Sequence, residues 1–348
     1  MNIEEIFNGA VSLKASDVHL NSGLPVSFRI DGSLNPIKNW PVLKHGDILA
    51  LLDQVIDESQ KKRLFDQKNL EFSYQIKNGV RFRISVFWEK NQLALAARLI
   101  QSRIPSLEEV EMPESARKVA DFKDGLVLVT GPTGCGKSTT LAALIDYINS
   151  KRACYIITLE DPIEYIFSSK KSVIAQRELG QDMVSFQSAL KHIVRQDPDV
   201  VLVSEMRDLE TVSLAITLAE TGHLIFATLH TPNAPQTIDR IIDIFPSDQQ
   251  MQIRLQVAMA LKCIISQHLV PGIRGGRTAA REILFNNPAV ANLIRENKIT
   301  QIRSVLQTGG KDGMSTLEQD LKRLYRQGKI DLKTAVGYAN YPEEITKE

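Results

Sequence analysis

The sequence has few cysteines and no long apolar run. Only three cysteines occur among 348 residues, and none belongs to a CxxC pair. The missing pairs exclude a four-thiolate zinc module, and scattered thiols in odd number are typical of a reducing cytosol. No stretch approaches the ~18 apolar residues of a membrane-spanning helix. The acidic start at Glu4 and Glu5 is unlike the basic start of a signal peptide. We therefore expect a cytoplasmic protein whose connection to a membrane, if there is one, goes through a protein partner.

An excess of charge of one sign is also missing. The chain has 42 Lys and Arg against 41 Asp and Glu, a formal net charge of +1. This balance gives no electrostatic reason to expect a nucleic-acid partner. Hydrophobic residues make up 43% and charged residues 24%, as in folded globular proteins. At about 150 residues per domain, the length predicts two domains, each able to bury its own core.

The first hundred residues have the pattern of a small α/β domain. Residues 3–13 and 46–65 have helical spacing, whereas 80–86 alternates and 93–100 is an apolar run, which predicts two neighbouring strands. The polar positions of these strands place three arginines on one face: Arg81, Arg83 and Arg98. Such a face is either simply solvated or supplies cations to phosphate chemistry in a neighbouring domain or subunit.

The remainder of the chain predicts a larger α/β domain. Residues 101–113 contain two prolines and three glutamates, which favours a linker and hinge. Beyond them, short Val/Ile/Leu runs alternate with longer helical segments, as buried parallel strands and crossover helices do. The runs are 125–130, 154–159, 199–204 and 224–229. We expect an N-terminal domain over 1–100, a linker over 101–113, a larger α/β core over 114–285 and a helical C-terminal region over 286–348.

A phosphate-binding loop follows the first of these runs. The pattern GxxxxGK[ST] is matched by Gly131, Pro132, Thr133, Gly134, Cys135, Gly136, Lys137 and Ser138. An apolar strand precedes the loop and a helix from Thr139 follows it, as the motif requires. Its glycines let backbone N–H groups surround phosphate oxygens, Lys137 reaches the β- and γ-phosphates, and the Ser138 hydroxyl binds Mg²⁺. The loop therefore predicts ATP and Mg²⁺ as cofactors, with Thr139 included in the binding set.

Acidic residues and histidines follow the other predicted strands. Glu205 comes after 199–203, where a carboxylate either binds Mg²⁺ or orients the attacking water. Glu160 and Glu164 come after 155–159 and are further candidate acids. His223 and His230 flank the strand 224–229. His230 lies at the carboxyl end, where open α/β sheets bind nucleotides, and could sense the γ-phosphate, whereas His223 has a structural alternative.

Several motifs in this order resemble those of one ATPase family. They are the segments 16–20 and 29–32, the phosphate loop, an acidic box over 159–164, the region 195–208, and a histidine box over 221–230 followed by 239–242. The chain resembles PilT-type ATPases of the type II/IV secretion superfamily, which are motors that retract bacterial type IV pili. The resemblance covers nearly the whole chain. It implies a PAS-like N-terminal domain, a RecA-like ATPase domain, and a ring of six subunits at the cytoplasmic face of the inner membrane.

The resemblance also implies roles for particular residues and partners. Glu205 and Glu164 match the family's functional acids, His223 and His230 match its box histidines, and Arg83 and Arg98 match arginines that reach the γ-phosphate. The implied partners are further copies of the chain and an inner-membrane pilus platform protein, with a paralogous pilus ATPase as a further candidate. No nucleic-acid partner is expected.

Alternatives remain open at this point. Pilus assembly and type II secretion ATPases have an additional N-terminal domain and usually a tetracysteine zinc module, so the lack of CxxC favours retraction. The stretch 288–296 ends in Asn-Leu-Ile-Arg-Glu like retraction motors but departs from them before Asn292, which leaves an accessory PilU-like paralogue open. A DNA translocase is disfavoured by the net charge. A non-hydrolysing scaffold is disfavoured by the presence of Lys137 and Glu205.

Overall fold

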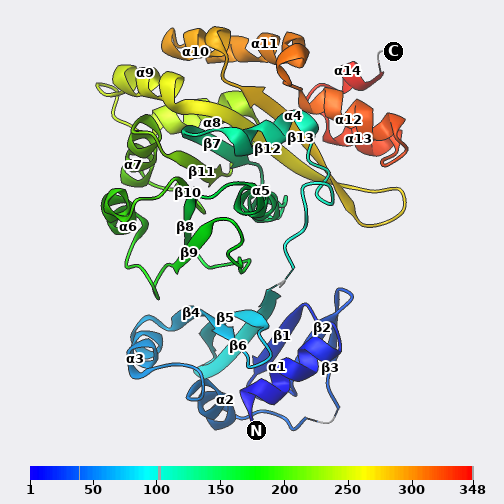
Figure 1. Cartoon of the computed structure of the whole chain (residues 1–348). Helices are drawn as coiled ribbons and strands as arrows, with labels where there is room; N and C mark the ends of the chain where they lie inside the picture. The colour runs from blue at the N-terminus through cyan, green and yellow to red at the C-terminus, as the bar shows by residue number, and fades with distance from the viewer. Residues whose placement is uncertain (39, 101–102, 347–348) are drawn as a thin grey trace. The chain divides into compact units, whose positions relative to one another are not determined.

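The computed structural model describes residues 1–38, 40–100 and 103–346. The chain forms two compact units: unit 1 contains Met1–Arg103 and Pro162–Ile166, and unit 2 contains Ile104–Asp161 and Phe167–Glu348. Each unit has its own sheet (Figure 1). Each also has its own hydrophobic core. Among the described residues, no helix combines the length and apolarity that crossing a membrane requires.

Unit 1 is a six-stranded sheet with helices that cover its apolar side. The strand order is β3-β2-β1-β6-β5-β4, and all neighbours are antiparallel. Phe7 stacks on Phe82 with ring centroids 4.2 Å apart at the centre of this core. The strands are β1 (Asp17–Asn21), β2 (Ser27–Ile30), β3 (Ser33–Pro36), β4 (Asn69–Gln75), β5 (Arg81–Glu89) and β6 (Gln92–Ile100), and the helices are α1 (Ile3–Ser12), α2 (His45–Leu52) and α3 (Glu58–Gln67).

The local predictions for unit 1 are largely confirmed. The helix over 3–13 is α1, and the two arginine-bearing strands are β5 and β6. The helical pattern over 46–65 is divided between α2 and α3. The division occurs because Asp57 forms a capping box, in which its side chain accepts from the N–H of Gln60. A capping box marks the start of a helix, so α3 begins here as a separate helix and does not continue α2.

Unit 2 is built on a seven-stranded sheet. The order is β13-β12-β7-β11-β10-β8-β9, with parallel neighbours except for the antiparallel pair β12 and β13. The four predicted strands are confirmed as β7 (Gly125–Thr130), β8 (Tyr155–Glu160), β10 (Val200–Val203) and β11 (Leu224–Leu229). Three further strands were not predicted: β9 (Val173–Glu178), β12 (Leu261–Pro271) and β13 (Arg277–Phe285). β12 and β13 contain buried polar residues such as Gln267 and Arg281, which interrupt the apolar run that marks a buried strand.

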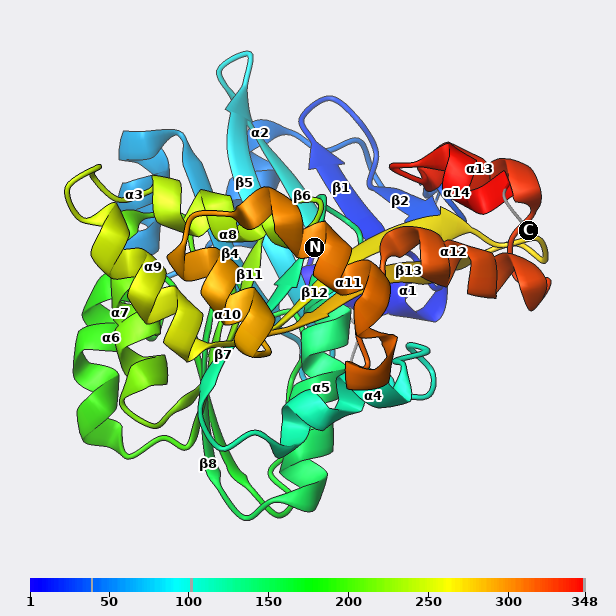
Figure 2. The same cartoon turned by 90° about the horizontal axis from the view of Figure 1, so that it is seen from above.

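Helices cover both faces of this sheet. In both views α6, α7 and α9 lie together on one side and α5 lies on the other (Figures 1 and 2). The helices are α4 (Glu114–Arg117), α5 (Lys137–Lys151), α6 (Phe186–Ile193), α7 (Leu209–Glu220), α8 (Ala234–Asp243), α9 (Gln250–Ala260), α10 (Pro288–Arg295), α11 (Ile302–Thr308), α12 (Leu317–Arg326), α13 (Leu332–Tyr338) and α14 (Pro342–Thr346), with 3-10 turns η1 (Lys118–Asp121), η2 (Val194–Gln196), η3 (Ile299–Gln301) and η4 (Gly309–Asp312).

The C-terminal helices are part of unit 2. Val290 and Ile302 from α10 and α11 are fully buried in the main core of this unit. Helices α12 to α14 form a second cluster with Val270 and Ala280 of the β12–β13 hairpin. The described helices α10 to α14 therefore pack against the hairpin and the main core of unit 2.

Most of the segment expected as a linker, 101–113, belongs to unit 2. Its residues 101–102 lie outside the described residues, and from Ile104 onward the chain belongs to unit 2. Leu107 and Met112 are buried, with exposed fractions of 1% and 3%. Burial of these side chains and the unit boundary after Arg103 assign 106–112 to unit 2.

Candidate active site

The phosphate loop occupies the turn between β7 and α5. Gly131, Gly134 and Gly136 have φ values of +138°, +77° and +89°, which side chains disfavour. A Cβ at Gly131 would lie 2.2 Å from the carbonyl oxygen of Gln267, whereas a Cβ at Gly134 would meet open space. The loop therefore leans against β12 at one side and is open at Gly134, where phosphate oxygens can approach.

Lys137 closes the loop from within. Its Nζ donates to the carbonyl oxygens of Gly131, at 2.8 Å, and Pro132, at 3.1 Å. The side chain is largely buried, and Ser138 and Thr139 follow it, half-buried, in the first turn of α5. This helix presents unsatisfied N–H groups and partial positive charge at the loop, so the arrangement suits an anion.

Glu205 and His230 lie beside the lysine. His230 Nε2 is 3.1 Å from Glu205 Oε1, and His230 Nδ1 is 3.5 Å from both Lys137 Nζ and Thr133 Oγ1. Arg207 Nη2 donates to Glu205 Oε2 at 2.8 Å. Burial by itself raises the pKa of Glu205, but the hydrogen bonds and charges of Arg207 and His230 outweigh it and hold that pKa below its ordinary value. Glu205 is therefore a carboxylate that can accept a proton or orient water.

Strand register explains why these residues meet. Thr130 of β7 pairs with Leu229 of β11, and Val203 of β10 pairs with Ala227 of β11. The three parallel strands therefore end at one edge, and the loop, His230 and Glu205 all follow these ends. This is the edge at which open α/β sheets bind ligands.

The other predicted acids are placed differently. Glu160 ends β8 and is buried, and its Oε1 accepts from Thr158 at 2.7 Å and from Gln176 at 3.0 Å. Its carboxylate is thus held at the same edge of the sheet. Glu164 is exposed and lies in the 162–166 segment, which groups with unit 1. Its functional role stays a prediction.

His223 lies at the opposite end of β11 from His230. Its Nδ1 is 3.1 Å from the carbonyl oxygen of Leu218 and 3.3 Å from Thr221 Oγ1. The six residues of β11 separate the histidines by roughly 20 Å at 3.3 Å per residue. The structure therefore does not bring His223 to the phosphate loop of its own chain, unlike His230.

The arginines of unit 1 share one face of its sheet, as the alternation predicts. Arg83 is directly opposite Arg98 across β5 and β6, and Arg81 is two residues further along β5. Arg83 pairs with Glu71 at 3.0 Å, and Arg98 with Asp17 at 2.9 Å. The Arg83–Glu71 pair is exposed at both ends and is of a kind that contributes ~0–1 kcal/mol, whereas the Asp17 side chain in the second pair is only 13% exposed.

Gln267 is a site residue that the sequence analysis did not identify. It is 1% exposed on β12, and its Nε2 donates to the carbonyl oxygen of Cys135 in the phosphate loop. A lone glutamine in an apolar strand was the only signal in the sequence, and it becomes informative only when β12 is known to lie beside β7.

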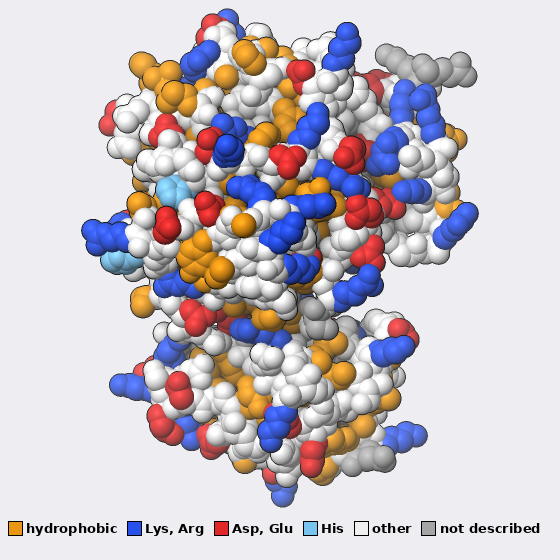
Figure 3. All heavy atoms as spheres, viewed as in Figure 1, with side chains coloured by type: hydrophobic (Ala, Val, Ile, Leu, Met, Phe, Trp, Pro, Cys, Tyr) orange, Lys and Arg blue, Asp and Glu red, His pale blue; other side chains and the backbone are white. Residues whose placement is uncertain are grey.

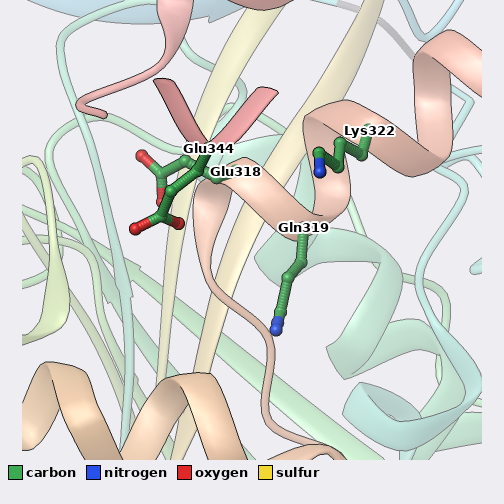
Figure 4. A pocket seen from close by; sticks show the side chains of 4 residues that line it. All are labelled: Glu318, Gln319, Lys322 and Glu344. Atoms are coloured by element: carbon green, nitrogen blue, oxygen red, sulfur yellow. The ribbon is translucent and has the colours of Figure 1, made fainter. Parts of the chain in front are cut away.

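A cavity away from the phosphate loop has an acidic wall. On the face that Figure 3 shows, basic and acidic side chains are interspersed. A cavity of about 240 Å³ in the C-terminal helices is lined by Glu318, Gln319, Lys322 and Glu344 (Figure 4). Two carboxylates in its wall repel phosphate, so this cavity does not compete with the loop.

Comparison with known proteins shows which family the chain belongs to. The family model for type II/IV secretion system proteins matches residues 1–274. The chain is 44% identical, over 99% of its length and 100% of the relative's, to the type IV pilus retraction ATPase PilT of Pseudomonas aeruginosa. It is 47% identical, over 96% of its length and 91% of the relative's, to a twitching motility protein of Neisseria gonorrhoeae. A crystal structure of the pilus retraction motor PilT with bound ADP matches with 46% identity and a TM-score of 0.93, over 99% of this chain and 98% of that one.

The fold and the loop define a nucleotide-binding phosphate-loop enzyme. The chain belongs to the type II/IV secretion system protein family, and it is an ATPase of the PilT type. The predicted α/β class, with a small N-terminal domain and a RecA-like ATPase domain, is confirmed.

Proposed function

We propose that this chain is the motor subunit of a six-membered ring that couples ATP hydrolysis to retraction of type IV pili. The proposal is supported by full-length similarity to a pilus retraction ATPase. It is also supported by the contacts of His230 with Lys137 and Glu205 beside the phosphate loop. We place the ring in the bacterial cytoplasm at the inner membrane, where a pilus platform protein is its partner.

Hydrolysis is assigned to the residues at the sheet edge. In the proposed reaction Lys137 leaves the carbonyl oxygens of its loop and pairs with the β- and γ-phosphates of ATP. Glu205 orients the attacking water. His230 contacts both Lys137 and Glu205, so binding of the γ-phosphate at Lys137 affects the position of the Glu205 carboxylate through this histidine. Glu160 and Glu164 are proposed as supporting acids.

The donor set fits Mg²⁺ held jointly with the nucleotide. Among the described residues no group of three or more His, Cys, Asp or Glu could hold a metal by itself. Ser138 in the first turn of α5 and Glu205 supply hard oxygen atoms, which Mg²⁺ prefers together with phosphate oxygens and water. When bound, the ion would neutralise charge on the β- and γ-phosphates.

The remaining predicted residues are proposed to act between subunits. His223 is roughly 20 Å from the loop edge of its own chain at 3.3 Å per strand residue, so it can approach a nucleotide only in a neighbouring copy. Arg81, Arg83 and Arg98 are proposed to stabilise transition-state charge on a neighbouring nucleotide. We propose 1–100, 114–285 and 286–348 as the functional parts of the chain. We also propose that unit 1 moves against unit 2 at a hinge before Leu107, because 106–112 belongs to unit 2.

The proposal is tested by counting surface pili in a strain that lacks the gene. We expect excess pili and lost surface motility, restored by the wild-type chain but not by Glu205→Gln. A bald surface would instead identify an assembly motor. Normal pili that become abnormal only when a second pilus ATPase is also removed would identify an accessory paralogue.

A further inference from the structure

A buried hydrogen-bonded chain joins the phosphate loop to the first residues of unit 2. It begins at the carbonyl oxygen of Cys135, which accepts from Gln267 Nε2. Gln267 Oε1 in turn accepts from Arg281 Nε at 3.1 Å and from Thr140 Oγ1 at 2.9 Å. Arg281, on β13, is also 1% exposed and is among the largest fully buried side chains of the described residues. All of these residues belong to unit 2.

The arginine fixes which way the glutamine amide faces. A guanidinium group has only donors, so the group that it contacts on Gln267 must be the oxygen. The NH₂ group of the same amide is then directed at Cys135. Without Arg281, the amide could rotate by half a turn and present its oxygen to another oxygen.

The glutamine in turn fixes a phosphate-binding donor. The peptide bond between Cys135 and Gly136 is planar and trans, so its C=O and N–H point in opposite directions. Because Gln267 holds the C=O on the side of β12, the N–H of Gly136 is directed to the other side, into the loop. Space for this contact exists only because residue 136 lacks a side chain, since a Cβ there would lie 2.9 Å from Gln267 Nε2.

The other end of the chain is the segment 106–112. Arg281 Nη1 donates to the carbonyl oxygen of Glu111 at 3.0 Å, and Nη2 donates to that of Val110 at 2.7 Å. This segment comes directly after the point at which unit 2 begins. The guanidinium group of Arg281 therefore contacts both Gln267, which holds the phosphate loop, and the segment 106–112 near the start of unit 2.

We propose that Gln267 is a positioning residue for the nucleotide phosphates, and that Arg281 transmits occupancy of the loop to residues 106–112. Phosphate oxygens that bind the Gly136 N–H polarise the whole peptide unit and strengthen its hydrogen bond to Gln267. The strengthened chain then stabilises the carbonyl groups of Val110 and Glu111 on Arg281. The inference rests on nucleotide binding alone and is independent of pilus retraction.

The main test variant is Gln267→Glu. The carboxylate keeps the shape of the side chain and pairs with Arg281, so we expect it to fold. It presents an oxygen rather than an N–H to Cys135 and so cannot hold the loop carbonyl. We expect MgADP, titrated on the purified full chain, to bind at least about tenfold more weakly, because a hydrogen bond to a charged or buried group contributes roughly this much.

Hydrogen exchange distinguishes coupling from simple support. In the wild-type chain, saturating MgADP should slow exchange both in 131–140 and in 106–112. In Gln267→Glu at saturating MgADP, slowing should persist in 131–140 and be lost in 106–112. The matched control is Thr278→Val, which removes a different hydrogen bond to the same segment, from Thr278 Oγ1 to Glu111 Oε2 at 2.9 Å, and should retain the wild-type response.

The outcomes decide the proposal. Wild-type affinity for MgADP in Gln267→Glu would overturn the positioning role. An unchanged response of 106–112 in that variant, or no response in the wild-type chain, would overturn the transmission. If Gln267→Glu does not fold, Gln267→Met, which also lacks the donor and is neutral, carries the same expectations.

Discussion

At the scale of single residues, Glu205 is the proposed centre of the hydrolytic site. It contacts both His230 and Arg207, and its depressed pKa keeps it ionised. The contacts explain how a carboxylate at the end of β10 stays directed at the loop. In the proposed mechanism, ATP binding depends on Lys137 and the loop, whereas Glu205 is needed for hydrolysis.

We therefore expect Glu205→Gln to bind ATP and to hydrolyse it slowly. General-base and water-orienting groups contribute about 10²- to 10⁴-fold to rates, and the loss of turnover should fall in that range. ATP affinity and turnover of the purified protein provide the measurement, with Glu210→Gln, an exposed substitution on α7, as the control. Turnover within twofold of the control would remove Glu205 from its assigned role.

Glu282 shows how the fold holds a carboxyl group in an unfavourable setting. It is largely buried, and its Oε1 accepts from the N–H of Ala234 at 2.7 Å at the start of α8. Burial, reinforced by the charge of Glu318, raises its pKa to about 7, although the Ala234 N–H and Arg303 act in the opposite direction. The loop that carries His230 leads into this helix, so Glu282 stabilises the loop's far end.

The raised pKa predicts a pH-dependent effect of Glu282→Gln. Between its unfolded value of about 4.3 and about 7, the folded state binds more protons than the unfolded state, so this group lowers stability as pH rises. The stability of Glu282→Gln relative to wild type should increase by about 1.4 kcal/mol for each pH unit between pH 5 and about 7, and it should level off between there and pH 8. Thermal midpoints of both proteins at the two pH values test this, and a constant difference would contradict it.

At the scale of elements, the phosphate loop depends on a strand far away in sequence. β12 lies beside β7 in parallel, and the backbone of Gln267 approaches Gly131 so closely that no side chain fits between them. Glycine is thus required at these loop positions for two different reasons. Gly134 needs only its positive φ, whereas Gly131 needs both its φ and the missing side chain.

This difference predicts unequal effects of two matched substitutions. Gly131→Ala should destabilise unit 2 by about 1–3 kcal/mol more than Gly134→Ala, because overpacking adds to the backbone strain that both share. Chemical denaturation without nucleotide measures the difference. Equal loss of stability in the two variants would show that contact with β12 does not constrain the loop.

At the scale of the whole molecule, the chain carries two separate sets of candidate groups. Lys137, Glu205 and His230 belong to unit 2, whereas Arg81, Arg83 and Arg98 belong to unit 1. If the arginines act on a neighbouring subunit's nucleotide, a complete site requires Lys137, Glu205 and His230 of one chain together with the arginines of another chain.

Mixing of inactive variants tests this arrangement. Lys137→Ala and Arg83→Ala should each hydrolyse ATP slowly alone. Together they should recover turnover, because the intact loop of one chain meets the intact arginine of the other. A mixture of Lys137→Ala and Glu205→Gln should recover nothing, since both defects lie in the same unit. Failure of the first mixture, with mixed assembly demonstrated by differently tagged chains, would assign the arginines to their own chain or to structure.

The sequence by itself determined those features that depend on a few neighbouring residues. The loop 131–138 was predictable because its glycines, lysine and serine are required within one turn, between a strand and a helix. The strands β7, β8, β10 and β11, and the arginine-bearing β5 and β6, were predictable because burial imposes a local pattern. The acids and histidines that follow strands were candidates for the same reason.

Only the tertiary structure decided which candidates meet. Strand register places His230 at the loop and His223 at the opposite end of the same strand. The hairpin of β12 and β13 was hidden because its buried Gln267 and Arg281 read as polar, and Gln267 meets Cys135 across 132 positions of sequence. Pairing over such distances depends on the energy of the whole packed sheet, so no local pattern in the sequence contains it.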